Sequence, residues 1–337
     1  MGSLVLSYGL ARLLGPLAIA WGYVDRPSRA PHRTLHKRPI PYGGGIAILA
    51  SLGLIVLLIT ALDAWPLPPS LHFRHVLSFF VGGGILLIGG MIDDYRSVSP
   101  RAQLVWSFVA VAVVVVGGIG VTSVRLPWGG IVALGAASQL FTVAWLLVVM
   151  YSTKLFDGLD GLVTGIGAIG GFILFAVSLL PVLNQPQNAL LALVFGSTCA
   201  GFLIINWHPA KMFLGQGGSL LIGFVLGVLS IMTGTKVITT LLIIGIPLLD
   251  ALWVVVRRVF IEHRSPFAAD RKHFHHRLLD AGFSHRQAVV AVLTATSLFG
   301  ISGYLLQTQE KVYALVLLGL IMLIVGFLLI QREQRQI

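Results

Sequence analysis

The chain has 337 residues, of which 56% are hydrophobic and only 10% are charged. Because a soluble globular domain carries about 25% charged residues, this composition excludes a soluble protein and predicts an integral membrane protein. The formal net charge of +11 does not indicate nucleic-acid binding, since in a membrane protein the side on which the charges lie decides their role. We therefore expect no nucleic-acid partner.

Apolar stretches long enough to span a bilayer recur along the whole chain. A β-barrel would show alternating polar and apolar residues, which are absent, so the stretches predict an all-α polytopic fold of one domain, residues 1–337, with about eleven transmembrane helices. In chain order these cover 4–22, 43–62, 76–92, 102–120, 132–151, 161–180, 189–205, 217–233, 237–256, 287–306 and 312–330. The segment at 132–151 is the weakest, because Ser138 and Gln139 interrupt it.

The basic residues predict how these helices are oriented. Eleven helices place odd and even loops on opposite sides, and the odd loops together with the C-terminus hold 18 of the 23 lysines and arginines. The positive-inside rule then puts the N-terminus outside and the C-terminus in the cytoplasm. The loops predicted to face the cytoplasm are 23–42, 93–101, 152–160, 206–218 and 257–286, and they carry the motifs that follow.

The first motif is the acidic pair Asp93 and Asp94, which ends the third predicted helix in the stretch GGMIDDYR. Two adjacent carboxylates could simply form a solvated helix end. At headgroup depth, however, two negative charges are costly without a cation beside them, so the pair favours a binding site.

The second motif is FDGLDGLVTG, which contains Asp157 and Asp160. Their i, i+3 spacing would place both on one helical face. An ordinary helix start, with Asp157 as N-cap, explains the acids alone. It does not explain Gly158 and Gly161, which weaken a first turn and suggest that a bulky group approaches the backbone.

Histidines form the third motif, KHFHHRLL, with His273, His275 and His276. The spacing is uncommon for zinc, and flanking basic residues disfavour a metal cation. A basic, histidine-rich loop suits phosphate oxygens better. A solvated basic loop at the membrane surface is the competing interpretation.

Asp250 is an acid inside the ninth predicted helix, about two turns from its inner end and after Pro247, where we expect a kink. An acid at this depth is a functional candidate, and Arg257 is its expected partner. The chain has a single cysteine, Cys199, which lies within an apolar segment. Disulfides within the chain and metal sites built from several cysteines are therefore excluded.

Taken together, carboxylates that can hold Mg²⁺ and basic groups that can hold phosphate are expected at one membrane surface. This combination favours phosphoryl transfer between a soluble nucleotide donor and a membrane lipid. An ion-coupled transporter is the alternative from another class, although its acids would lie near the membrane midplane.

The motifs RTLHKRPIPYGGGIAI, MIDDYRSVSPRAQL, LFDGLDGLVTG, NWHPAKMFLGQGGS and SPFAADRKHFHHRLLDAGFSHRQAV, in this order, carry a family resemblance. The chain resembles the bacterial polyprenyl-phosphate N-acetylhexosamine-1-phosphate transferases of the WecA and TagO type, and more distantly MraY. The resemblance implies transfer of a sugar 1-phosphate from a UDP-N-acetylhexosamine, with UDP-GlcNAc the best guess, to polyprenyl (undecaprenyl) phosphate, releasing UMP. It also implies a multi-pass protein of the bacterial plasma membrane that starts cell-envelope glycan synthesis; a homodimer is left open.

The resemblance also assigns roles to residues. The catalytic acids are Asp93, Asp94, Asp157 and Asp160; the nucleotide- and phosphate-binding residues are Lys37, Lys154, Asn206, Arg271, His273, His275 and His276; and the ligands for Mg²⁺ (or Mn²⁺) are Asp93, Asp94 and Gln216. The sequence departs from the family pattern in two places. Tyr151 and Lys154 stand where the family often has asparagines before the second acidic motif, and Gln216 replaces an aspartate that binds metal. An impaired or inactive member that binds nucleotide or lipid is therefore an alternative.

Overall fold

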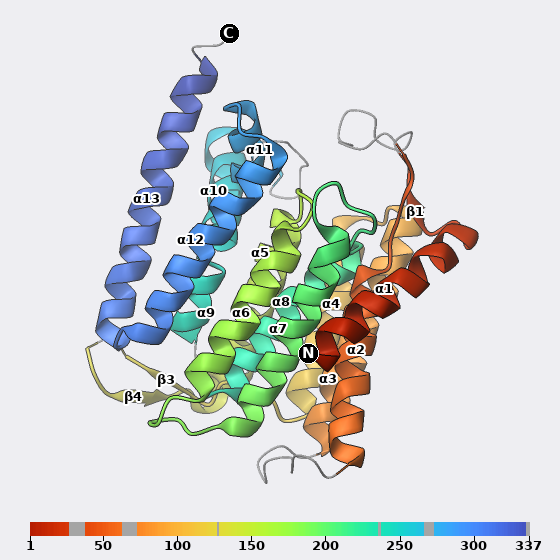
Figure 1. The fold of residues 1–337 in the computed structure, drawn as a ribbon. Helices are drawn as coiled ribbons and strands as arrows, with labels where there is room; N and C mark the ends of the chain where they lie inside the picture. The colour runs from red at the N-terminus through yellow and green to blue at the C-terminus, as the bar shows by residue number, and fades with distance from the viewer. Residues whose placement is uncertain (27–37, 63–72, 127, 235–236, 266–272, 335–337) are drawn as a thin grey trace.

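The computed structural model describes residues 1–26, 38–62, 73–126, 128–234, 237–265 and 273–334. Helices dominate this part of the chain (Figure 1). They are α1 (Gly2–Ala20), α2 (Gly44–Ala61), α3 (Phe73–Arg96), α4 (Pro100–Val116), α5 (Ser138–Phe156), α6 (Leu162–Ser178), α7 (Pro186–Asn206), α8 (Gln216–Met232), α9 (Val237–Ile243), α10 (Gly245–Val256), α11 (Phe274–Asp280), α12 (His285–Leu305) and α13 (Thr308–Gln334). A short 3₁₀ helix, Gly135–Ala137, precedes α5, and a π-helical turn, Arg257–Ile261, follows α10.

Each of the eleven predicted apolar segments contains a helix, and the membrane-protein class is confirmed. Among the described residues, seven helices are long and apolar enough to cross a membrane, and the bent pair α9–α10 raises the number to eight. The helices α4, α6 and α8 are apolar but shorter, with 17 residues each. The eleven-span count and the direction in which the chain crosses the membrane therefore stay predictions.

In two places the structure differs from the predicted transmembrane helices. The segment expected at 132–151 begins as a β-hairpin, with β3 (Ser123–Arg125) antiparallel to β4 (Ile131–Ala133), and only then enters α5. Glycines at 129 and 130, with φ of 100° and 87°, form its turn. The segment at 237–256 breaks into α9 and α10, which are bent by 78°. The break lies before Pro247, whose ring is tolerated in the first turn of α10.

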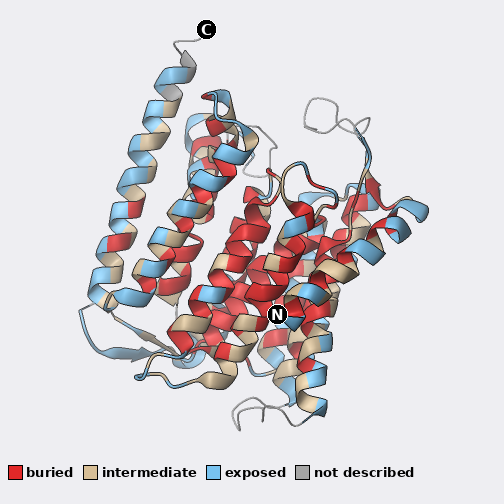
Figure 2. Ribbon diagram, viewed as in Figure 1, coloured by how far each residue is buried: buried red, intermediate tan, exposed pale blue. Residues whose placement is uncertain are grey.

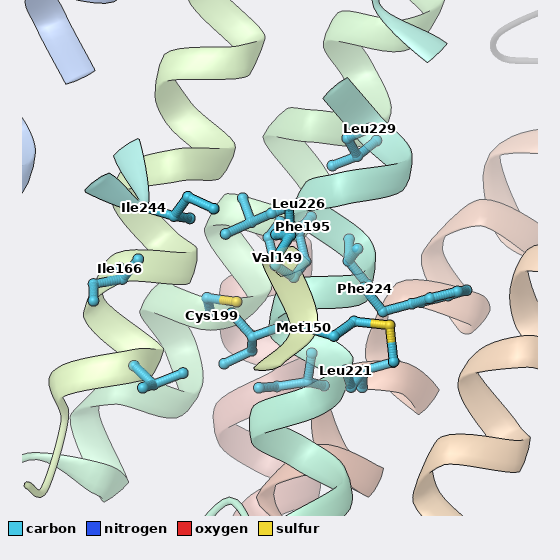
Figure 3. Packing of buried hydrophobic residues seen from close by; sticks show 14 of the residues in the cluster. Val149, Met150, Ile166, Phe195, Cys199, Leu221, Phe224, Leu226, Leu229 and Ile244 are labelled. Carbon is cyan, nitrogen blue, oxygen red and sulfur yellow. The ribbon is translucent and has the colours of Figure 1, made fainter. Parts of the chain in front are cut away.

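Helix α8 forms the centre of the bundle. Every residue from Gly217 to Ile231 is buried, which is typical of a helix surrounded by protein on all sides. Figure 2 shows this buried zone on α6, α7 and α8, and Figure 3 shows Val149, Phe195, Cys199 and Leu226 packed there. By contrast, α13 at the edge is largely exposed, as expected for a helix that faces lipid.

Small residues allow α1 to pack closely against α7. Its buried positions are Ser3, Ser7, Ala11, Gly15 and Ala18. A side chain at Gly201 of α7 would collide with the backbone oxygen of Leu4. Backbones approach in this way where small residues line a helix interface in a membrane, so α1 is part of the core on one side only.

The segments that carry the sequence motifs gather at one end of the bundle. Figure 1 shows β1, the turn between α5 and α6, α11 and the C-terminus at that end, with the β3–β4 hairpin at the other. The strand β1 (Val24–Asp25) pairs antiparallel with β2 (Ile40–Pro41). A parallel bridge from Tyr42 to Phe213 then ties β2 to the loop before α8. The motifs are therefore brought together by backbone pairing as well as by helix packing.

Candidate active site

Asp93 lies at the end of α3, where protein groups occupy its carboxylate. Oδ1 accepts a hydrogen bond of 3.0 Å from the backbone N–H of Val98. Oδ2 lies 3.9 Å from Nζ of Lys154, which also donates a 2.6 Å hydrogen bond to Oε1 of Gln103. Lys154, which stands where the family often has asparagine, thus places a cation beside a buried acid. A buried negative charge at headgroup depth is costly without such a partner.

Asp94 is held by two other segments. Its Oδ2 accepts a 2.7 Å hydrogen bond from the hydroxyl of Tyr23, and the backbone N–H of Gln216 lies 3.2 Å from Oδ1. Burial, with the negative charge of Asp94 next in importance, raises the pKa of Tyr23, so its hydroxyl stays a donor. Gly215 has φ of 79°, and a Cβ there would lie 2.9 Å from Oδ2 of Asp94. A glycine is needed here on both counts.

Asp157 and Asp160 do not share a helical face, so that prediction is wrong. Asp157 ends α5, and α6 begins only at Leu162 after Gly161, whose φ is 80°. The glycines turn the chain between the two acids. Asp160 accepts hydrogen bonds at Oδ2 from the backbone N–H of Ala210, 3.1 Å away, and contacts Nδ1 of His208 at 2.7 Å.

Asp157 is the most exposed of the four acids, and like Asp160 it lines a cavity. Desolvation by the protein around it raises the pKa of Asp157 to about 7; a hydrogen bond from Ser219 partly offsets the rise, and the charges of Asp160 and Asp94 add to it. The carboxylate thus combines access to a ligand with an environment that favours a cation beside it.

Asn206 has a structural partner for each end of its amide. Oδ1 accepts hydrogen bonds from the backbone N–H of Gly161 at 3.1 Å and from the hydroxyl of Thr164 at 2.8 Å. Nδ2 donates to the carbonyl of Met212 at 2.9 Å. Asn206 therefore joins the start of α6 to the glycine loop; its assignment to the nucleotide stays a prediction.

The three histidines have three different environments. His273 contacts Asp250, so Arg257 is not the partner seen for this acid and lies 3.8 Å from Glu262 instead. His275 is buried, and a side chain at position 158 would collide with its ring. This confirms that a glycine of the second motif admits a bulky group.

His275 packs edge-on against Phe156, with ring centroids 5.0 Å apart. Burial, with the neighbouring histidines as smaller contributions, holds the pKa of His275 well below its usual range, so the ring is neutral. Only His276 of the three lines the cavity. The histidine motif thus presents one ring to a ligand and uses the other two for packing and hydrogen bonding.

A cavity of about 1180 Å³ joins these segments. Its acids are Asp25, Asp157 and Asp160, and its basic groups include Arg12, Arg38, Lys211, His208 and His276. It is somewhat larger than the common ligand site of about 300–1,000 Å³, so it has room for a ligand as large as a sugar nucleotide. Gln216 also lines the cavity, whereas Asp93 and Asp94 lie behind that wall.

A histidine pair closes one side of the cavity. The rings of His208 and His285 stack with centroids 3.9 Å apart and planes at 17°, and ligand atoms of both lie within 4.8 Å of one of Asp160. These residue types can bind zinc. However, nitrogen lone pairs lie in the ring planes, and those of two stacked rings run side by side. The arrangement therefore suits a contact that joins the start of α12 to the loops carrying Asp160 and His208, rather than a metal centre.

The sequence analysis missed His208, Lys211, Arg12 and Arg38, which line the cavity. The first two stand within NWHPAK, a stretch already selected for its asparagine, so their proximity to that motif was the available signal. Arg12 lies within α1, and a cation inside an apolar helix was a signal. Lys37 and Arg271 lie outside the described residues.

Known proteins resemble this chain over most of its length. A family model described as glycosyl transferase family 4 matches residues 76–234. The decaprenyl-phosphate N-acetylglucosaminephosphotransferase of Mycolicibacterium smegmatis is 32% identical over 315 residues, covering 86% of this chain and 76% of that protein.

Two further relatives match a similar share of this chain. A probable undecaprenyl-phosphate N-acetylglucosaminyl 1-phosphate transferase of Bacillus subtilis is 29% identical over 87% of this chain and 79% of its own length. The undecaprenyl-phosphate alpha-N-acetylglucosaminyl 1-phosphate transferase of Escherichia coli K12 is 28% identical over 90% and 81%. The chain therefore belongs to the polyprenyl-phosphate N-acetylglucosamine-1-phosphate transferase family within glycosyl transferase family 4.

Proposed function

We propose that this protein transfers N-acetylglucosamine 1-phosphate from UDP-GlcNAc to a polyprenyl phosphate and releases UMP. The observation that carries the proposal is the cavity, which gathers Asp157, Gln216 and His276 from three separate motifs. The names of the three relatives all state a transferase acting on a polyprenyl phosphate. Nothing in them supports the alternative of an inactive member.

The reaction exchanges one phosphoanhydride for another. An oxygen of the lipid phosphate attacks the β-phosphorus of the donor, the bond from that phosphorus to the bridging oxygen breaks, and UMP leaves with this oxygen. A phosphate monoester has a second pKa near 6 and is mostly dianionic at pH 7. The acceptor therefore needs no general base, and the protein's task is positioning and stabilisation of charge.

The basic residues of the cavity wall can bind the phosphates, and its apolar residues can contact the lipid chain. Lys211, Arg38 and His276 supply positive charge for the phosphates of the two substrates. Gly15 and Ile19 of α1 form an apolar flank of the same cavity. Such a flank lets a lipid chain approach while its phosphate reaches the polar wall. We place this end of the bundle at the cytoplasmic face of the bacterial plasma membrane, on the distribution of the basic residues.

A magnesium or manganese ion fits the oxygen donors of the cavity. Asp157 offers a carboxylate and Gln216 a side-chain carbonyl, and Mg²⁺ prefers oxygen ligands. Asp94 stands behind Gln216 as a buried charge, while Asp93 is engaged by Lys154. When bound, the ion would neutralise charge on the diphosphate. The expected ligands are thus Asp157 and Gln216, with Asp93 and Asp94 as outer charges.

Transfer to lipid tests the proposal directly. Purified protein in detergent receives polyprenyl phosphate, Mg²⁺ and UDP-GlcNAc labelled in the sugar and, separately, in the uridine. The expected result is sugar label in the lipid extract with an equal amount of labelled UMP. UDP-GalNAc and UDP-glucose serve as matched donors, and EDTA should stop turnover. Absence of lipid-linked label from every donor, in protein that still binds UDP, would contradict the proposal.

A further inference from the structure

Asp250 is a buried acid that the proposed reaction does not use. It lies in α10, its residue is 4% exposed, and it does not line the cavity. An ionisable residue within an apolar helix is costly and persists where it has a definite partner and task. Its contacts indicate what that task is.

Both carboxylate oxygens of Asp250 bind the start of the histidine motif. Oδ2 lies 2.7 Å from Nδ1 of His273, and Oδ1 accepts a 2.7 Å hydrogen bond from the backbone N–H of Phe274. Because an ionised carboxylate only accepts, Nδ1 of His273 carries a proton. Asp250 thereby sets the orientation of this ring.

The second contact matters for α11, the helix that carries His275 and His276. His273 is the N-cap residue of α11, yet its side chain makes no capping hydrogen bond. Asp250 supplies an acceptor for the first helical amide from another helix, and its negative charge lies at the helix N-terminus, where it is favourable.

Helix α11 depends on such anchors because it has only seven residues. A helix of this length is not stable alone in water. Asp250 fixes its first turn against α10, and His275, seated against Gly158, fixes its next residues against the turn after α5. His276 follows the segment held by these two anchors directly in the chain and lines the cavity.

We propose that Asp250 is a positioning residue that holds α11 and thereby places His276 for binding of the UDP-sugar. The proposal rests on the function proposed above. In this role Asp250 does not contact the substrate. It also does not bind a transported ion, as the acid of an ion-coupled transporter would. Loss of Asp250 should therefore affect the donor nucleotide and leave the lipid substrate largely unaffected.

The test compares Asp250→Ala, which removes both contacts, with Asp250→Asn, whose carbonyl can still accept from Phe274. Asp280→Ala is the matched control, because Asp280 is an exposed acid at the other end of α11. We expect Asp250→Ala to raise the KM for UDP-GlcNAc by at least about tenfold, with the KM for polyprenyl phosphate within about twofold of wild type. Asp250→Asn should be less affected, and Asp280→Ala should match wild type.

A double-mutant cycle shows whether Asp250 acts through the histidine. If it does, adding Asp250→Ala to His276→Ala should raise the donor KM little further, since coupled residues are not additive. Fully additive losses, or equal losses for donor and lipid, would overturn the proposal.

Hydrogen exchange of the amides at 274–280 gives a readout that needs no turnover. Exchange should rise in Asp250→Ala and not in Asp280→Ala; unchanged exchange in both would overturn the proposal. If wild type shows no transfer, the proposed function fails while this measurement still tests Asp250. Should Asp250→Ala fail to fold, His273→Ala and His273→Asn replace it. Asparagine keeps a donor for Asp250, so it should protect α11 better, and equal exchange in the two would count against the proposal.

Discussion

The two acidic pairs of this protein differ in what surrounds them. Asp93 and Asp94 end α3 and are engaged by protein groups, namely Lys154 on one side and Tyr23 with the Gln216 amide on the other. In the second pair, Asp160 is engaged by His208, and Asp157 faces the cavity. Similar pairs in the sequence therefore have different roles: the first pair lies outside the cavity lining, and the second pair lines the cavity, with Asp157 the more exposed of its two acids.

The difference shows how a buried site can hold several acids. Each engaged carboxylate receives hydrogen bonds or a cation, which favour its ionised form. Asp157 is the exposed acid of the four, and it lines the cavity. It gains most from a cation supplied with the substrate, so the comparison predicts that Asp157 is the most sensitive acid in catalysis.

The largest expected effect follows from replacing Asp157. Asp157→Asn should lower kcat by at least about 10³-fold, because it removes charge at the reacting phosphates. Asp160→Asn should cost less, since the amide keeps an oxygen that can accept from Ala210. Initial rates at saturating donor and lipid measure both. Equal losses for the two variants would contradict the distinction between engaged and presented acids.

Position 216 gives the next largest effect. Gln216→Asp and Gln216→Glu should raise turnover at limiting Mg²⁺ by at least about tenfold, or roughly 1.4 kcal/mol of barrier, by adding charge to the proposed metal site. Without metal, thermal stability should fall slightly or stay unchanged, because a further acid joins Asp94. A Mg²⁺ titration of each purified variant is the measurement. Identical curves for all three proteins would mean that residue 216 does not bind the metal.

A smaller effect is expected from Tyr23, which holds Asp94. Tyr23→Phe keeps the ring stacked on Tyr95 and removes only the hydroxyl, a loss of about 1–3 kcal/mol in stability. Turnover should fall by severalfold. Tyr95→Phe is the control, because its hydroxyl makes an exposed 3.4 Å contact with the carbonyl of Trp21. Thermal melts that do not separate the two variants would show that the Tyr23 hydroxyl adds nothing.

The smallest effect is a dependence of stability on pH. The folded-state pKa of Asp157 is raised to about 7, above that of the unfolded chain, so the folded state binds the extra proton. In the absence of divalent metal, stability should therefore fall as pH rises from about 4 to about 7. Asp157→Asn should show a flatter profile in melting curves across this range. If stability depends on pH equally strongly in Asp157→Asn and in wild type, another group is responsible for the dependence.

The helices could be predicted from the sequence because apolar length is a local property. The hairpin at 123–133 could not, since its strands are three residues each and it follows an apolar run. Motif membership indicated which segments form the site. It could not indicate that Asp250 pairs with His273 rather than Arg257, because that choice depends on how α10 meets α11 in space.

Glycines were informative in a different way. Gly158 was correctly interpreted as leaving room for a bulky group, and the group is His275. The sequence could not name that partner, which lies far along the chain. It also could not show that Asp157 is the most exposed of the four acids, because this depends on the partners that Tyr23, Lys154 and His208 provide to the other three.

The close seam between α1 and α7 has a consequence for how the protein is made. Helix α1 is synthesised before α2 to α6, whereas Gly201, which it packs against in α7, is synthesised only after them. Until then the buried face of α1, which includes Ser3, Ser7 and Ala11, has no α7 surface to pack against. The first helix must therefore stay near the insertion machinery, or be held against α2, while the next five helices are inserted. Helix α1 can therefore take its final place in the bundle only once α7 has been inserted.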